Sequence, residues 1–173
     1  MSRIYFQETQ KFRQVWIWAL IFLATILWFL QFIIQIFLHK PVGNNPAPDL
    51  VIILVGVIPV GVILLLRFAK LEVIVRRDGI YYRFFPFIYK FKIIHKEELE
   101  SYEVRKYNAI RDYGGWGIRT GFLHKGSALN VKGNMGVLFT FKKGKKMLIG
   151  SQKAEEFKAA IDKAFGPHSE FTE

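Results

Sequence analysis

Two long apolar runs lie near the N-terminus of the chain, and nothing comparable follows them. Residues 15–38 and residues 50–66 carry no charged side chain. A helix rises about 1.5 Å per residue and a bilayer core is about 30 Å thick, so the first run is long enough to cross it. The second run reaches that length when Phe68 and Ala69 extend it. We therefore expect a transmembrane helical hairpin with helices over 15–38 and 50–68.

The distribution of basic residues predicts how such a hairpin is oriented. Three basic residues precede the first run and four follow the second within residues 67–77, whereas the short link between the runs carries only Lys40. Positive charge favours the cytoplasmic side, so the sequence predicts a cell membrane protein with two spans and cytoplasmic N- and C-termini. The residues expected at the membrane interface are Trp16, Trp18, Arg67 and Lys70.

The remaining chain alternates like short β-strands and then ends in one helix. Asp78-Gly79 between two β-branched or aromatic runs is typical of a hairpin turn. Phe157, Ile161 and Phe165 lie on one face of a helix that Ser151 is expected to cap. The pattern predicts an α+β protein whose seven-stranded β-barrel is capped by this C-terminal helix. The expected strands are residues 71–76, 80–85, 88–94, 101–106, 128–131, 137–141 and 147–149.

Three segments of the second half carry a family resemblance. They are residues 114–119 (GGWGIR), 130–137 (NVKGNMGV) and 148–152 (LIGSQ). With them the chain resembles, over roughly residues 10 to 165, bacterial membrane proteins in which two spans precede a pleckstrin-homology-like (PH-like) domain. The resemblance implies a PH-like fold on a membrane anchor, in a family of largely unassigned function. The expected domains are a membrane anchor over 1–69, a PH-like domain over 70–166 and a flexible tail over 167–173.

Net charge narrows the class of partner. The chain holds 25 Lys and Arg against 14 Asp and Glu, a formal charge of +11. A basic domain beneath an anionic leaflet is attracted to its lipids without specificity, by about 1 kcal/mol per basic residue near the surface. Because the membrane already supplies the opposite charge, we expect no nucleic acid partner. The absence of cysteine excludes disulfides and thiolate chemistry.

The glycine-rich stretch at 114–117 permits two interpretations. Its backbone N–H groups could cradle an anion, but the stretch lacks the spacing of a phosphate-binding loop. A tight loop, in which the glycines adopt unusual backbone angles and Trp116 packs over the domain, is the favoured interpretation. The surrounding arginines and aromatic residues are the best candidate for contact with a partner or lipid. These candidates are Arg105, Tyr107, Arg111, Tyr113, Trp116 and Arg119.

Aromatic residues also crowd residues 81–91. Alternation along a strand points half of them into the domain and leaves the others exposed. The exposed half is a candidate face for contact with the membrane or a partner.

The sequence gives no support for catalysis. Its four histidines are scattered without metal-ligand spacing, and no nucleophile motif is present. We expect no catalytic residues, no metal and no cofactor. The favoured function is a membrane-anchored binding or scaffolding domain at the inner leaflet, whose partner is an unknown protein or a second copy of the chain. An accessory subunit of a transport or export complex, acting through its helices, is the alternative, and a lipid-headgroup receptor is a third class.

Overall fold

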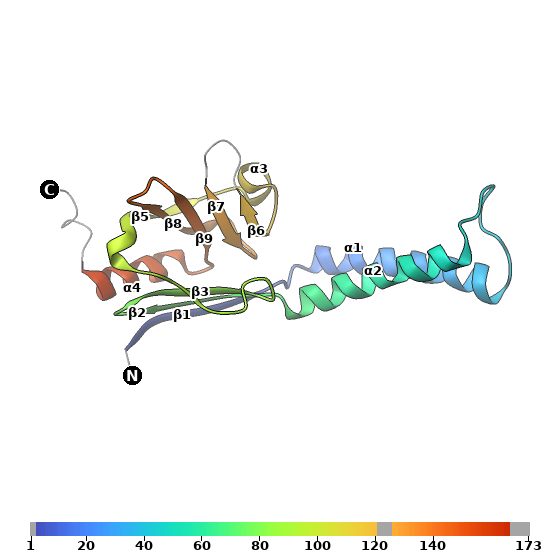
Figure 1. Cartoon of the computed structure of the whole chain (residues 1–173), viewed down its shortest axis with the longest axis horizontal. Helices are drawn as coiled ribbons and strands as arrows, with labels where there is room; N and C mark the ends of the chain where they lie inside the picture. The colour runs from blue at the N-terminus through green and yellow to red at the C-terminus, as the bar shows by residue number, and fades with distance from the viewer. Residues whose placement is uncertain (1–2, 121–125, 167–173) are drawn as a thin grey trace. The chain divides into compact units, whose positions relative to one another are not determined.

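The computed structural model describes residues 3–120 and 126–166, and the chain divides into two units (Figure 1). The helical unit comprises Arg13–Phe68. The β unit combines Met1–Phe12 with Ala69–Glu173, so its two parts lie on either side of the helical unit in the sequence. The predicted tail over 167–173 lies outside the described residues.

The first sheet of the β unit has four antiparallel strands in the order β1-β2-β3-β4. Strand β2 alternates strictly, and its inward residues Leu71, Val73 and Val75 are completely buried. The predicted hairpin at Asp78-Gly79 is confirmed, because β2 and β3 pair from Arg76↔Gly79 onward. The strands are β1 (Ile4–Lys11), β2 (Lys70–Arg76), β3 (Gly79–Phe85) and β4 (Lys92–Ile94).

Strand β1 was not expected, because residues 1–69 were assigned to the membrane anchor. The structure instead pairs β1 with β2 over nearly its whole length, up to Lys11↔Lys70. Its alternation is hard to recognise since only one of its buried side chains, Phe6, is apolar. The other, Gln10, donates from Nε2 to the Gly150 carbonyl oxygen at 2.7 Å. A polar residue that finds a partner inside the protein gives no hydrophobic signal in the sequence.

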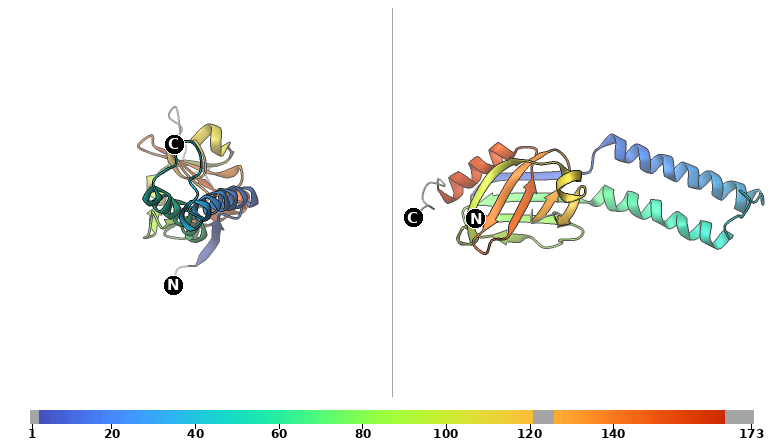
Figure 2. Two further views of the ribbon diagram at one scale, coloured as in Figure 1. Left: turned by 90° about the vertical axis from the view of Figure 1, so that its right-hand side faces the viewer. Right: turned by 90° about the horizontal axis from the view of Figure 1, so that it is seen from above.

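The second sheet has five strands in the order β5-β8-β9-β7-β6. All its pairs are antiparallel except β7 with β9, which is parallel. The prediction of a seven-stranded barrel is therefore wrong: the described residues form nine strands in two separate sheets (Figure 2). The strands are β5 (Leu99–Lys106), β6 (Gly117–Thr120), β7 (Ser127–Asn130), β8 (Met135–Phe141) and β9 (Lys146–Gly150), and a short 3₁₀-helix η2 (Lys96–Glu98) precedes β5.

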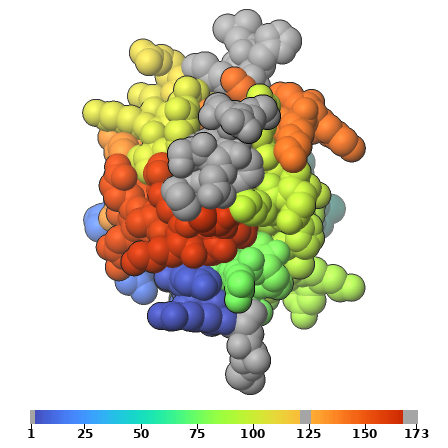
Figure 3. All heavy atoms as spheres, turned by 90° about the vertical axis from the view of Figure 1, so that its left-hand side faces the viewer, coloured from blue at the N-terminus to red at the C-terminus, as the bar shows by residue number. Residues whose placement is uncertain are grey.

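The C-terminal helix α4 (Ala154–Phe165) packs on the β unit through the predicted apolar stripe. Phe157 is fully buried and stacks on Phe6 of β1 with ring centroids 5.1 Å apart. Figure 3 shows α4 in red beside β1 in blue. The helix starts later than expected, with Lys153 rather than Ser151 at its N-cap.

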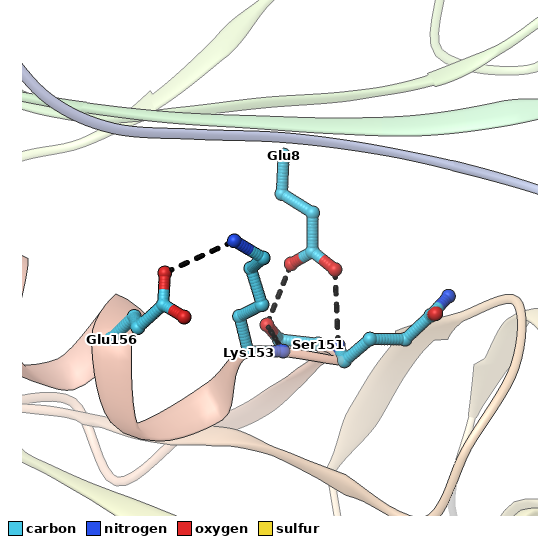
Figure 4. Close-up of polar contacts among 5 residues, drawn as sticks. Glu8, Ser151, Lys153 and Glu156 are labelled. Carbon is cyan, nitrogen blue, oxygen red and sulfur yellow. Dashed lines mark hydrogen bonds and ion pairs between the residues drawn. The ribbon is translucent and has the colours of Figure 1, made fainter.

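Glutamate 8 of β1 supplies the polar contacts at the start of α4 (Figure 4). Its Oε2 accepts a hydrogen bond from Ser151 Oγ at 2.6 Å, and its Oε1 accepts one from the Gln152 N–H at 3.0 Å. Ser151 Oγ in turn accepts from the Lys153 N–H at 3.0 Å. Strand β1 thus contributes both an apolar ring and a carboxylate to the seating of α4.

The helical unit is an antiparallel pair of apolar helices. Helix α1 (Val15–Phe32) continues as a π-helical turn η1 (Ile33–Phe37), and α2 (Asp49–Phe68) follows the link. Both helices are long and apolar enough to cross a membrane. No residue of α1 is buried, and α2 buries only Ile52 and Gly56.

Three hydrogen bonds, from Trp28 and Gln35, hold the helical pair together. Trp28 Nε1 donates to the Ile52 carbonyl oxygen at 2.9 Å, and the Trp28 ring fills the space beside Gly56. Near the link, Gln35 Nε2 donates to the Ala47 carbonyl oxygen at 2.6 Å and to Asp49 Oδ1 at 2.9 Å. Each contact satisfies a side-chain donor within the pair.

Candidate functional site

The six candidate contact residues fall on β5, on the link from β5 to helix α3 (Ala109–Tyr113), on α3 itself, on the segment that leads into β6 and on β6. The structure brings Tyr107, Arg111 and Trp116 together around one groove. Arg105 lies outside the groove lining and pairs with Glu103, with NH2 at 2.9 Å from Oε1. Arg119 also lies outside it, and its Nε donates to the Trp116 carbonyl oxygen at 2.9 Å.

Helix α3 is short, and side chains close its first turn. Asn108 is the N-cap, and its Oδ1 accepts from the N–H groups of Ile110 and Arg111 at 3.1 and 3.0 Å. Asp112 Oδ2 accepts in return from the Asn108 N–H at 2.8 Å. This reciprocal arrangement satisfies N–H groups that a helix start leaves without partners. It fixes the direction in which Ile110 and Arg111 leave the backbone.

The glycines after α3 end the helix and turn the chain into β6. Gly114 adopts a left-handed conformation with φ of 72°, and its N–H donates to the Ile110 carbonyl oxygen at 2.8 Å. The Gly115 N–H reaches the Ala109 carbonyl oxygen, also at 2.8 Å. Such paired bonds are the usual C-cap of a helix that ends at glycine.

The same bonds bear on the anion-cradle interpretation. A third N–H, that of Gly117, donates to Asn130 Oδ1 at 3.0 Å. The N–H groups of Gly114, Gly115 and Gly117 are therefore all engaged inside the β unit. The loop interpretation accounts for the glycines, and these three groups cannot serve an anion.

Two of the candidate aromatic residues belong to the interior. Tyr107 and Tyr113 are buried and meet edge to face, with ring centroids 6.0 Å apart. They form a second core cluster with Trp116 packed against it. Burial raises the pKa of Tyr107 to about 12, and it also raises the pKa of Tyr113. Tyr107 lines the groove from beneath, and both tyrosine side chains are buried.

Glycine 150 explains why Tyr107 can lie so deep. A Cβ at this position would stand 2.8 Å from Tyr107 Oη and 3.0 Å from Asn130 Cβ. Glycine at this position of β9 leaves room for the phenol of Tyr107. Within the motif at 148–152, the glycine at position 150 is therefore explained by the packing of Tyr107 in the second core cluster.

The groove itself has a volume of about 600 Å³ and is lined by residues 106–112, Trp116, Gly133 and Asn134. Its rim combines an exposed aliphatic side chain with basic groups. Ile110 is 63 % exposed, and Arg111 projects beside it with Nε 4.0 Å from Asp112 Oδ1. Lys106 adds a second positive charge. The combination of an aromatic wall, an aliphatic anchor and guanidinium suits contact with another protein.

Sequence reasoning missed Ile110, Lys106 and Asn134 as parts of this rim. Asn134 accepts at its carbonyl oxygen from the Tyr107 N–H at 2.8 Å, which ties the turn before β8 to the end of β5. The signal that could have found Ile110 is its place two residues after the N-cap Asn108, since an N-cap fixes which residues of the first turn point outward.

Within residues 3–120 and 126–166, no group of histidine, aspartate and glutamate side chains could hold a metal ion. A half-buried ionic contact lies elsewhere, in the first sheet, where Glu72 pairs with Arg83 and Lys70. Burial pushes the pKa of Glu72 upward, but the hydrogen bonds from Arg83 and Lys70 outweigh it and hold the pKa below its usual value. That contact crosses neighbouring strands and is structural.

Comparison with known proteins gives one match. A family model described as a family of unknown function (DUF6141) matches residues 2–167. No curated protein and no solved structure matches the chain.

Proposed function

The chain belongs to the DUF6141 family, whose function is unknown, and we propose that it is a non-catalytic membrane protein presenting a binding or scaffolding domain at the inner leaflet. Helices α1 and α2 are the proposed spans, and the β unit is the proposed binding domain. The observation that carries the proposal is the pairing of β1 with β2, because these neighbouring strands are the chain segments that enter and leave the two apolar helices.

The exposure of the helices supports a membrane location. Large apolar side chains are exposed along both α1 and α2, and the Trp28 and Gln35 contacts are made within the pair. A soluble protein rarely exposes so much contiguous apolar surface. Lipid acyl chains are the environment in which helices apolar on all sides are stable.

The place of β1 argues against a cleaved signal sequence at α1. Cleavage after α1 would remove β1 together with it. The β unit would then lose the ring of Phe6 from its core and the carboxylate of Glu8 from the start of α4. The first apolar helix is therefore proposed to remain in the mature protein.

Strand pairing also bears on topology. The junctions Phe12–Gln14 and Ala69 are short, so the two helix ends attached to β1 and β2 are proposed to lie on the same side of the membrane. Basic residues gather at these ends and favour the cytoplasm. Trp16 is exposed in the first turn of α1 and Arg67 stands in the last turn of α2, as expected of interface residues. Trp18 also lies in α1, and Lys70 pairs with Glu72 at 3.3 Å.

The layout of the β unit supports a PH-like assignment. Two sheets with a C-terminal helix packed against them agree with the resemblance in residues 114–119 and 148–152. We assign the groove beside α3 as the binding surface, for a protein partner or a second copy of this chain. Anionic lipids attract the basic β unit without specificity.

Topology can be tested directly because the chain has no cysteine. Asn44→Cys places a thiol in the link, and Lys143→Cys places one in the exposed β8–β9 turn. An impermeant maleimide added to intact cells should label position 44 and leave position 143 unlabelled until the cells are permeabilised. Labelling of both positions, or of neither, in intact cells would contradict the proposed topology.

The binding role is tested by photo-crosslinking in native membranes. A photoreactive amino acid at Ile110 should give a discrete crosslinked product, and the same group at Lys143 should not. A product of twice the chain mass identifies a second copy. Exchange of α1 and α2 for an unrelated apolar hairpin should preserve the product. Loss of the product on exchange would favour the accessory-subunit alternative, in which the helices make the contact.

A further inference from the structure

The turn between β3 and β4 exposes a group of aromatic side chains. We name residues 86–91 the aromatic turn. Phe87 is 65 % exposed and Tyr89 is 70 % exposed, and Phe91 is exposed to a smaller extent. Few large apolar side chains of the described β unit are exposed at all, and these three lie within five consecutive residues. Such a concentration marks a contact surface.

The backbone of the aromatic turn holds these rings outward. The Ile88 N–H donates to the Phe84 carbonyl oxygen at 2.7 Å. Ile88 packs against the core, and Phe84 is buried within it. The neighbours of Ile88 on either side touch β3 with one ring contact each, Phe87 on Phe84 at 6.5 Å and Tyr89 on Phe85 at 6.1 Å between centroids, and stay largely exposed. Their exposure is thus built into the turn, because the inward position is already taken by isoleucine.

Strand register fixes the position of the aromatic turn on the sheet. Lys11 pairs with Lys70, and Lys70 pairs with Phe85, the last residue before the turn. The turn therefore begins at the end of the sheet where β1 ends and β2 starts, which is also visible in Figure 2. At this end of the sheet the chain passes into α1 and returns from α2.

Charge distinguishes what this surface can contact. Residues 86–94 contain Lys90 and Lys92 and no acidic residue. Both lysines are exposed. Aromatic rings accompanied by lysine are the combination that favours the headgroup region of an anionic leaflet.

We propose that the aromatic turn is a lipid contact that inserts Phe87 and Tyr89 into the headgroup region of the leaflet, while Lys90 and Lys92 lie against anionic lipid. This inference rests on the proposed function, since it needs α1 and α2 to span the membrane. It adds a third attachment point to the two helices. The β unit is thereby held with one defined edge toward the lipid.

The test uses the full chain in vesicles of phosphatidylcholine and phosphatidylglycerol. Single nitroxide-labelled cysteines are introduced by Tyr89→Cys in the turn, by Leu27→Cys in α1 and by Arg77→Cys at the opposite end of the β2–β3 hairpin. The measured quantity is the ratio of accessibility to oxygen over accessibility to a water-soluble nickel chelate, which rises with depth. Phe87→Cys is a second label in the turn and guards against a local effect at one position.

We expect the ratio at positions 89 and 87 to lie between the high value at 27 and the low value at 77. A low ratio at 89 and 87 with a high ratio at 27 would overturn the lipid contact and leave the spanning helices intact. A low ratio at 27 would overturn the spanning helices themselves. Spectral broadening at 89 that disappears on dilution with unlabelled protein would assign the turn to an interface between copies, and would also overturn the proposal.

Discussion

Lys11 and Lys70 are register partners on neighbouring strands, although the whole helical unit lies between them in the sequence. The helical hairpin is therefore an insertion in the connection between two adjacent strands of one sheet. The β unit is therefore not a purely C-terminal domain, because its first strand precedes the helices in the sequence.

This relationship predicts which soluble fragment folds. A chain in which an Asn-Gly turn joins Lys11 directly to Lys70 should fold, because antiparallel partners lie about 5 Å apart and a two-residue turn can close them. The fragment 70–173 lacks β1 and should not unfold cooperatively, since it loses Phe6 and Glu8. Urea unfolding followed by circular dichroism compares the two. Equal cooperativity and stability in both would show that β1 is dispensable.

Removing the carboxylate of Glu8 should destabilise the β unit. Glu8→Ala leaves Ser151 Oγ and the Gln152 N–H without their acceptor. Loss of a side-chain acceptor at a helix start costs about 0.5–2 kcal/mol in the free energy of unfolding. Gln7→Ala, an exposed position on the same strand, is the matched control, with an expected change below about 0.5 kcal/mol. Urea titrations measure the free energy of unfolding of both variants. Equal values for Glu8→Ala and Gln7→Ala would contradict the role assigned to the Glu8 carboxylate.

The close contact between Trp28 and Gly56 predicts a selective effect of one methyl group in the helical unit. A Cβ at position 56 would stand 2.0 Å from Trp28 Cζ2, and the Nε1 hydrogen bond restrains the ring from moving away. Gly56→Ala should therefore cost about 1–3 kcal/mol, as overpacking generally does. Gly61→Ala provides the control, because no atom lies within 4 Å of a Cβ there.

Thermal unfolding in detergent, followed by the fluorescence of Trp28 in a background with the other tryptophans replaced by Phe, measures both glycine variants. Since Gly61 lies in the same helix, helix propensity alone would shift both variants equally. An equal shift would exclude the Trp28 contact as the cause.

Burial of Tyr107 predicts a loss of stability in alkali. The pKa of its phenol is about 12 in the folded protein, above the ordinary value near 10. Above pH 10 the unfolded chain releases this proton while the folded chain retains it. The contribution of Tyr107 is therefore undiminished below pH 10 and falls by about 1.4 kcal/mol per pH unit between pH 10 and 12.

Tyr107→Phe should make the decline of unfolding free energy between pH 10 and 12 less steep. Urea midpoints measured across that interval test the slope, and a measurement at pH 8 checks that the variant is folded. An unchanged slope would mean that the phenol keeps its ordinary pKa in the folded protein.

The sequence predicted the elements whose pattern is apolar. The helices, the β2–β3 hairpin and the stripe of Phe157 and Ile161 were all recognisable, because each shows an uninterrupted run or a regular spacing. Strand β1 escaped detection because its inward Gln10 is satisfied by Gly150 across the fold. No local pattern reveals a polar residue whose partner lies at the other end of the chain.

The candidate site divides in the same way. Arg111 and Trp116 were recognised by residue type and do line the groove. Tyr107 and Tyr113 are predicted contact residues that the structure buries in the second core cluster, and of the two only Tyr107 also lines the groove. The sequence alone does not distinguish a tyrosine exposed in a surface patch from a tyrosine buried beneath that patch. What separates them here is the space above Gly150, which only the fold shows.

The split of the β unit around its insertion also sets an order of events during synthesis. Strand β1 leaves the ribosome before its neighbour β2 and cannot pair with it until both apolar helices and then β2 have been made. At the usual translation rates this wait lasts seconds. The sheet can therefore close on β1 only after the helical hairpin is complete, and until then the backbone N–H and C=O groups of β1 lack the partner strand.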